Sequence, residues 1–235
     1  MKQNLENLLK ERIDPKLVPR YDTYTHIQRY ELALKKVSGL ILDLGCRLGY
    51  GSQLLANNNP VVAIDATLEC LKYAKKEYGG NVQYVLADAQ NLPFKDTSFN
   101  SIVALEVIEH VQNGKHLLAE TYRVIKKGGI VVLSTPNCTN LGNRIKHLFL
   151  MRPYPRKAVC AYHVWEYAFT ELNDLANQTK FCVNEKYGQI LPLPLWLNLI
   201  VTSQKLKTDI IYRIIVDMGK PFPQFAYHMI FIMKK

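Results

Sequence analysis

Apolar and polar residues alternate along the chain in a pattern typical of strands separated by helices. Five short apolar runs are bounded by glycine, proline or polar residues, which predicts buried strands. These predicted strands are residues 41–44, 61–64, 82–87, 101–105 and 130–134. Apolar residues recur at helical spacing between them, so the order predicts a parallel sheet covered by helices on both faces.

Two of the helices carry clear apolar stripes. Thr67 is the expected N-cap of a helix over residues 68–78. Residues 114–127 predict a second such helix, which the glycine pair at 128–129 should end. The expected inward positions of the first helix are Leu68, Leu71, Ala74 and Tyr78.

The second half of the chain predicts fewer regular elements. Residues 135–168 hold three prolines and one predicted helix, residues 143–150. The elements expected after this segment are a helix at 170–180 and strands at 181–190 and 225–233. So long an excursion in a compact domain is usually functional. We therefore expect one domain over residues 1–235, with 135–168 and 191–224 as additions on the substrate side.

Composition and charge narrow the class of protein. The net charge of +10 favours anionic partners, although the lysines are scattered in the manner of a solvated surface. Five cysteines without a C-x-x-C pair make a disulfide framework or a zinc site unexpected and fit a reducing cytoplasm. No signal peptide or membrane span is expected from the apolar runs, so the predicted location is cytoplasmic.

The first predicted strand runs into a glycine-rich turn, "ILDLGCRLGYG" at residues 41–51. A dinucleotide fingerprint starting at Gly45 needs glycine at positions 47 and 50, which are Arg47 and Tyr50 here. The pattern present is D-x-G-x-x-x-G from Asp43, with glycine at 45 and 49. Asp65 ends the second strand, where an acid can accept hydrogen bonds from ribose hydroxyls. The turn therefore argues against a nicotinamide dinucleotide and leaves other adenosine cofactors.

Several segments in order, over roughly residues 26–185, resemble class I S-adenosylmethionine-dependent methyltransferases of the methyltransferase type 11 kind. They include "VVAIDATLECLKYAKKEY", "VQYVLADAQNLPFKDTSFNSIVALEVIEHV" and "ETYRVIKKGGIVVLSTPN", and the closing "FAYHMIFIMKK" is similar to the family's antiparallel seventh strand. The resemblance implies a Rossmann-like, mostly parallel seven-stranded sheet and S-adenosylmethionine as cofactor. It implies Asp65 for the ribose, Asp88 for the adenine amino group and the Gly45–Gly49 backbone for the methionyl part. The candidate cofactor-binding residues are Gly45, Cys46, Arg47, Gly49, Asp65, Ala66, Asp88, Ala89, Leu105 and Glu106.

The candidate catalytic residues are His110 and His163, because an imidazole can remove the proton of an acceptor hydroxyl near neutral pH. Glu106, Glu109 and His110 share one helical face by spacing. With His163 they form a set similar to that of metal-assisted ubiquinone-pathway and small-RNA O-methyltransferases. We keep this set as an alternative and assign no metal.

The substrate is the least constrained part of the prediction. We expect O-methylation of a small molecule, of a glycan or lipid-pathway intermediate, or of a carrier-linked acceptor. An RNA methyltransferase is the first alternative, although no basic stripe interleaved with aromatic residues supports nucleic acid. An inactive cofactor-binding regulator is the second, motivated by Arg47, whose side chain we expect in solvent or on the carboxylate of the cofactor. Peripheral membrane contact and any oligomeric state are compatible with the sequence.

Two groups of aromatic and apolar residues are candidates for the substrate side. Tyr154, Tyr162, Trp165 and Tyr167 are expected to shape a substrate pocket or to pack the long segment. Leu193, Leu195, Trp196, Leu197 and Ile200 are expected to form a lid, a dimer contact or part of the core.

Overall fold

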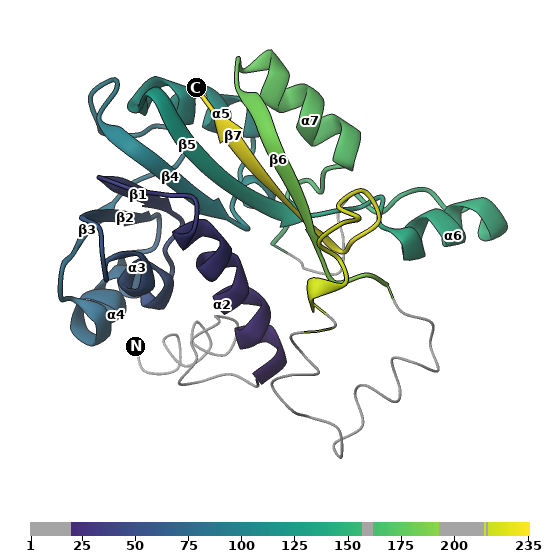
Figure 1. Ribbon diagram of the computed structural model, residues 1–235, viewed down its shortest axis with the longest axis horizontal. Helices are drawn as coiled ribbons and strands as arrows, with labels where there is room; N and C mark the ends of the chain where they lie inside the picture. The colour runs from purple at the N-terminus through teal and green to yellow at the C-terminus, as the bar shows by residue number, and fades with distance from the viewer. Residues whose placement is uncertain (1–19, 157–161, 193–213, 215) are drawn as a thin grey trace.

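Seven strands form one sheet in the computed structural model, in the order β3-β2-β1-β4-β5-β7-β6 (Figure 1). The structure describes residues 20–156, 162–192, 214 and 216–235. The strands are β1 (Ile41–Leu44), β2 (Val61–Asp65), β3 (Val82–Leu86), β4 (Phe99–Leu105), β5 (Ile125–Pro136), β6 (Cys182–Gln189) and β7 (His228–Lys234). Strands β1 to β5 are parallel, and β7 is antiparallel to both of its neighbours. The predicted mostly parallel sheet with an antiparallel last strand is confirmed.

Helices cover both faces of this sheet. They are α2 (Arg20–Leu34), α3 (Tyr50–Leu55), α4 (Leu68–Tyr78), α5 (Gly114–Val124), α6 (Leu141–Leu150) and α7 (Phe169–Gln178), with a short 3-10 helix at Ile108–His110. Buried side chains of α5 and α7 belong to one core cluster, and those of α2, α3 and α4 belong to a second. The sheet therefore separates two apolar layers, as the alternating βα order predicts.

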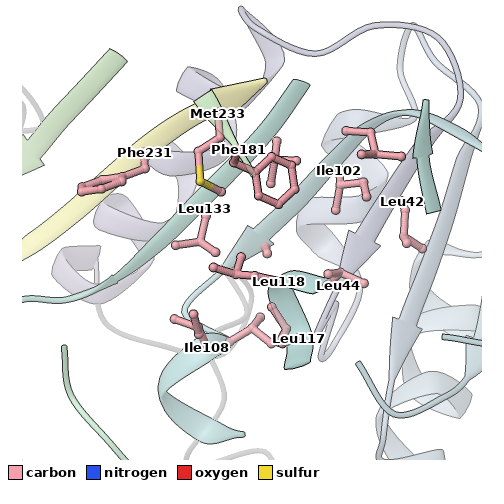
Figure 2. Packing of buried hydrophobic residues seen from close by; sticks show 14 of the residues in the cluster. Leu42, Leu44, Ile102, Ile108, Leu117, Leu118, Leu133, Phe181, Phe231 and Met233 are labelled. Atoms are coloured by element: carbon pink, nitrogen blue, oxygen red, sulfur yellow. The ribbon is translucent and has the colours of Figure 1, made fainter. Parts of the chain in front are cut away.

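Alternate residues of each strand supply the two layers. In β1, Leu42 and Leu44 belong to the layer under α5, where Figure 2 shows Leu44 near Leu118. Ile41, which points to the other face of the strand, belongs to the layer under α2 and α3. Because the central strands are buried on both faces, they read in the sequence as continuous apolar runs.

Two local predictions are wrong. The helix expected at 114–127 ends at Val124, and Ile125 already begins β5 in register with Phe99 of β4. Ile125 is fully buried there, so a strand contact outweighs helical continuation. Leu68, expected on the inward stripe of α4, is 43% exposed. It is the first residue of the helix and lies three residues after the end of β2.

Helix α6 differs from the other α-helices that the structure describes because none of its side chains is buried. The helix follows the end of β5 and projects beyond the two layers (Figure 1). Among the residues that the structure describes, no helix is long and apolar enough to cross a membrane. The predicted lid or dimer contact at 193–200 lies outside the described residues.

Candidate functional site

The glycine-rich turn after β1 needs its two glycines for packing as well as for backbone geometry. Gly45 and Gly49 have φ angles of 69° and 86°, in the left-handed region that favours glycine. A Cβ atom at Gly45 would lie 2.7 Å from Cγ2 of Val107, and one at Gly49 would lie 2.6 Å from Cβ of Ala74. The turn is therefore fixed tightly against the end of β4 and against α4.

A buried carboxyl group supports the turn from below. Asp43 of β1 is fully buried and accepts a hydrogen bond of 2.6 Å from Oγ of Ser52 in α3. Burial raises the pKa of Asp43 to about 7, against the hydrogen bonds from Ser52 and Tyr30, which lower it. The first acid of the D-x-G-x-x-x-G pattern thus joins β1 to α3 and does not reach the surface.

The two acids expected to hold the nucleoside lie at the ends of β2 and β3. The half-buried carboxylate of Asp65 accepts backbone N–H bonds from Arg47 (3.0 Å) and Thr67 (2.8 Å). Asp88 is exposed and accepts a backbone N–H bond of 2.8 Å from Gln90. Each carboxylate oxygen has a second lone pair, so both acids keep acceptor capacity for hydroxyl or amino groups.

Two leucines beside these acids escaped the sequence analysis. Leu68 lies three residues after Asp65 and is 43% exposed, and Leu86, the register partner of Asp65 in β3, is 53% exposed. An exposed apolar pair next to two acids suits a planar ring that carries amino and hydroxyl groups. Their exposure at a strand end could not be inferred from helical or strand periodicity, since both positions fit core patterns.

The residues around the glycine-rich turn fit the chemical groups of S-adenosylmethionine. The turn brings backbone close to a ligand without a Cβ at positions 45 and 49, and Asp65 and Asp88 offer acceptors for ribose and adenine. Ala66 is exposed and Ala89 half-buried beside these acids, where small side chains leave room. Cys46 and Leu105 are buried, so mainly their backbone is available to a ligand.

Glu106, directly after β4, is held in a left-handed conformation with φ of 56°. Its side chain forms an ion pair of 3.1 Å with Nη1 of buried Arg29 and accepts hydrogen bonds from Ser134 Oγ (2.7 Å) and His228 Nδ1 (3.0 Å). Burial alone would raise the pKa of Glu106, but the charges of Arg29 and His228 outweigh it and hold the pKa well below its usual range. Glu106 is therefore an anion locked between α2, β5 and β7.

The pKa of Glu109 is shifted in the opposite direction from that of Glu106. Its carboxyl group is fully buried, with Oε2 accepting a bond of 2.9 Å from Thr135 Oγ1 and Oε1 without a hydrogen-bond partner in the described part of the chain. Burial, and then the negative charge of Glu106, raise the pKa of Glu109 well above its usual value. The two glutamates of the "EVIE" stretch therefore have different protonation behaviour.

His110 joins the glycine turn to the long segment after β5. Its Nδ1 lies 3.1 Å from the carbonyl oxygen of Tyr162, and its Nε2 lies 3.3 Å from Nη2 of Arg47. A carbonyl oxygen only accepts and a guanidinium only donates, so Nδ1 carries the proton and Nε2 accepts from Arg47. Burial lowers the pKa of His110, and the charge of Arg47 adds to that lowering. Arg47 thus contacts His110 instead of lying free in solvent, and its contact with the carboxylate of the cofactor stays a prediction.

His163 lies against His110, with ring centroids 4.9 Å apart. The backbone N–H of Val164 donates to the carbonyl oxygen of Glu109 (2.8 Å), which fixes the segment that carries His163. His163 Nδ1 lies 2.7 Å from Oε1 of buried Glu166, so this nitrogen donates to the carboxylate. The remaining ring nitrogen of His163 has no hydrogen bond to any residue of the described chain.

Three of the four residues considered for a metal come together. Glu109, His110 and His163 each offer a ligand atom, and these atoms lie within 4.8 Å of one another. Carboxylate oxygen and imidazole nitrogen are ligands for several divalent transition metals. Glu106 is not part of the group, because its carboxylate is occupied by Arg29, Ser134 and His228.

The four aromatic residues proposed for a substrate pocket have different environments. Tyr167 is buried in the core under α5, and Trp165 lies 5.2 Å from the guanidinium carbon of Arg156. Tyr154 stacks on His147 of α6, and Tyr162 is exposed beside His110. Tyr162 and Trp165 therefore remain candidates for a substrate pocket, whereas Tyr167 packs the fold.

The family model, the relatives and the solved structure described below are all methyltransferases. A family model described as "Methyltransferase domain" matches residues 42–133. Over 96 residues, the chain is 36% identical to a malonyl-[acyl-carrier protein] O-methyltransferase of Hamiltonella defensa, covering 40% of this chain and 37% of that enzyme. It is 28% identical over 162 residues to a ubiquinone/menaquinone biosynthesis C-methyltransferase of Geotalea daltonii, covering 59% of this chain and 68% of that enzyme.

The chain spans less than two thirds of several curated relatives: 37% of the Hamiltonella enzyme and 47% of the Marinomonas enzyme of the same name. Among solved structures, an S-adenosylmethionine-dependent methyltransferase of Thermotoga maritima, titled a possible histamine N-methyltransferase, superposes with a TM-score of 0.67 at 17% identity. The superposition covers 92% of this chain and 93% of that one. At this identity the likeness confirms the Rossmann-like fold and leaves the acceptor open.

Proposed function

Because the chain belongs to the class I S-adenosylmethionine-dependent methyltransferases, we propose that it transfers a methyl group to an oxygen of a small-molecule or carrier-linked acceptor. The observation that carries the proposal is the His163–Glu166 pair of 2.7 Å beside His110, which itself contacts Arg47 of the glycine turn. A proton acceptor therefore stands next to the turn expected to hold the cofactor.

His163 is the better of the two candidate bases. Its Nδ1 proton is donated to Glu166, which leaves the other ring nitrogen as an acceptor and stabilises the imidazolium once it forms. Both nitrogens of His110 already have partners, Tyr162 and Arg47. For a hydroxyl acceptor we therefore assign His163 the removal of the proton, and we assign His110 the placement of Arg47 and of the segment at 162–166. A carboxyl acceptor such as malonyl is already ionised near neutral pH and needs only alignment with the methyl group.

The remaining candidate residues bind and orient. Bound S-adenosylmethionine would supply a methyl group already activated by its sulfonium charge. Asp65 and Asp88 are proposed to hold its ribose and adenine, with Leu68 and Leu86 against the ring. Alignment of acceptor oxygen and methyl carbon is the main task of the protein in such a displacement, because the electrophile is activated before it binds.

A carrier-linked acceptor is supported by two relatives whose names specify malonyl-[acyl-carrier protein] and O-methylation. The net charge of +10 suits an acidic carrier protein or a phosphorylated carrier arm. A C-methyltransferase among the relatives gives the carbon acceptor as the contrast to be tested.

The test has two stages that fail separately. Calorimetry with S-adenosylmethionine, S-adenosylhomocysteine and NAD should show binding of the two sulfur compounds and none of NAD. Transfer of a labelled methyl group is then measured with malonyl-acyl carrier protein and with small hydroxy acids and phenols. If neither S-adenosylmethionine nor S-adenosylhomocysteine binds, the proposal is overturned. If the labelled product carries its new methyl group on carbon, only the proposal of O-methylation is overturned.

The Glu109, His110 and His163 group favours a metal-assisted form of the same reaction as second candidate. A divalent ion there would supply a Lewis acid for the acceptor oxygen. The buried, unpartnered Oε1 of Glu109 is the observation that favours it, since a buried carboxylate oxygen is costly without a partner. The two forms differ in whether activity survives removal of divalent ions.

A further inference from the structure

The end of α6 carries an unusual concentration of exposed apolar side chains. Five of the seven residues at positions 145–151 are large and apolar, with exposed fractions from 49% to 89%. They are Ile145, Leu148, Phe149, Leu150 and Met151. An exposed apolar group of this kind marks a surface that binds something. None of these residues belongs to the candidate functional site.

Polar contacts hold this end of the helix in shape. Met151 has φ of 47°, which ends α6, and the chain turns back at Arg152. His147 Nδ1 lies 2.8 Å from the carbonyl oxygen of Arg152, and its ring stacks on Tyr154 with centroids 4.6 Å apart. The apolar side chains therefore stand on a braced protrusion, which Figure 1 shows outside the layers of the fold.

The part of the sequence around this tip is rich in positive charge. Residues 121–165 contain eight lysines and arginines and no aspartate or glutamate. Lys146 and Arg152 are exposed next to the apolar residues. Apolar side chains beside cations match the two parts of an anionic lipid surface, because acyl chains take the first and headgroups attract the second.

The arrangement suits a bilayer better than a protein groove. A groove takes one stripe of a helix, at i, i+3 and i+4 spacing. Ile145, Leu148 and Phe149 have that spacing, but Leu150 and Met151 extend the exposed apolar surface around and past the end of the helix, beyond a single stripe. We infer that the tip of α6 inserts into the surface of a membrane that contains anionic lipid.

The inference is tested by vesicle sedimentation with the full chain. One set of vesicles is phosphatidylcholine alone, and the other is equal parts phosphatidylcholine and phosphatidylglycerol. We expect binding to the mixed vesicles that weakens as salt rises, and little binding to phosphatidylcholine. The double variant Leu148→Ser/Phe149→Ser should lower the partition coefficient by about tenfold or more, since two large apolar side chains no longer enter the bilayer.

Two further variants separate the apolar and electrostatic parts. Lys146→Glu/Arg152→Glu should abolish the preference for the mixed vesicles. Met218→Ser, which removes a 43% exposed methionine outside α6, should leave binding unchanged. Circular dichroism and binding of S-adenosylhomocysteine check that each variant is folded, independently of methyl transfer.

Other outcomes assign the tip elsewhere. No binding to either vesicle, or equal loss with Met218→Ser, overturns the inference. A salt-dependent complex with an acidic acyl carrier protein that Leu148→Ser/Phe149→Ser abolishes, without vesicle binding, would assign the tip to a protein partner instead. Dimer dissociation by the same double variant in sedimentation velocity, again without vesicle binding, would assign it to a second copy of the chain.

Discussion

The guanidinium of Arg47 lies 3.3 Å from Nε2 of His110. This contact joins the glycine turn after β1 to the 3-10 helix after β4, and through His110 Nδ1 it reaches the carbonyl oxygen of Tyr162. Arg47 lies in the middle of the turn and has a left-handed backbone with φ of 48°. The side chain of Arg47 therefore has a defined partner. The arginine at a position where a dinucleotide fingerprint has glycine connects the turn to His110.

Replacing Arg47 by alanine should raise the pKa of His110. Burial is the main cause that lowers the pKa of His110, and the charge of Arg47 also favours the neutral imidazole, so removing that charge takes away one cause of the lowering. The measurement is an NMR titration of the His110 ring in the wild type and in Arg47→Ala.

Arg47→Lys is the matched control, because it keeps the positive charge and loses the planar guanidinium. We expect its His110 pKa to stay close to that of the wild type. An unchanged pKa in Arg47→Ala would contradict the coupling. Calorimetry on the same variants tests a separate contact: a loss of about 1 kcal/mol or more in S-adenosylmethionine affinity would assign the guanidinium to the cofactor carboxylate as well.

Replacing His163 should slow methyl transfer and leave cofactor binding intact. A general base contributes about 10²–10⁴-fold to a rate, so His163→Asn is expected to lose activity in that range. Glu166→Gln should cause a smaller loss, because the imidazole keeps a hydrogen-bond partner but loses the negative charge that stabilises its protonated form. The rate is followed with labelled S-adenosylmethionine, and its affinity is followed by calorimetry.

His147→Asn provides the comparison for a histidine outside the site, since His147 lies on exposed α6. Its rate should match the wild type. Equal losses in His147→Asn and His163→Asn would indicate a general effect on folding, and full activity in His163→Asn would exclude it as the base.

The sequence was sufficient for the parts of the site that follow regular elements. Strand ends are read from apolar runs, so the glycine turn, Asp65 and Asp88 could be placed at one edge of a parallel sheet. The mostly parallel seven-stranded sheet with an antiparallel last strand came with the family resemblance and is confirmed, whereas the strand order is known only from the structure. Leu68 fitted the stripe of α4, and only the structure shows that this first residue of the helix is exposed while Leu71 is buried.

The contacts that define the chemistry could not be read from spacing. Arg29 and His228 lie far apart in the sequence, and both bind Glu106 because the fold brings α2 and the start of β7, which pairs with β5, close to the residue after β4. His163 was a candidate base, but its pairing with Glu166 depends on hydrogen bonds from Val164 and Trp165 to the backbone of Glu109. Such pairings arise from tertiary packing of irregular segments, which carry no periodic signal.

A divalent ion should bind at Glu109, His110 and His163 only if the methyl transfer is metal-assisted. Protein freed of metal with EDTA is titrated with manganese and magnesium by calorimetry, and its methyl transfer is measured with and without each ion. In the metal-assisted form, Glu109→Gln loses ion binding, whereas Glu106→Gln keeps it because Glu106 is tied to Arg29. Activity that is insensitive to EDTA, together with no bound ion, would leave His163 as a metal-free base.

Removing Arg29 should destabilise the fold. Arg29→Met leaves the anion of Glu106 buried with one charged partner fewer, and breaking a buried pair in this way costs about 3–5 kcal/mol in the free energy of unfolding. Urea denaturation measures the loss. In the double variant Arg29→Met/Glu106→Gln no anion is stranded, so most of the stability should return. Losses that simply add in the double variant would show that the ion pair is not the cause.

Asp43 should make stability depend on pH in an unusual direction. Its pKa in the folded protein is about 7, compared with 3.8 for an ordinary aspartate, so the folded state holds a proton that the unfolded state releases. The contribution of Asp43 to stability is therefore complete below about pH 4 and falls as pH rises to about 7, by a few kcal/mol in total. Asp43→Asn lacks this change. Its free energy of unfolding, minus that of the wild type, should increase over this window and then level off.

The measurement is urea denaturation of wild type and Asp43→Asn at intervals from about pH 3 to pH 8, the range that brackets both pKa values. Taking the difference between the two proteins removes the titration of all other groups. Asp174→Asn, at an exposed aspartate of α7, is the control and should give a difference that does not change across the range. A constant difference for Asp43→Asn would mean that Asp43 is already ionised in the folded protein, with the bonds from Ser52 and Tyr30 outweighing its burial.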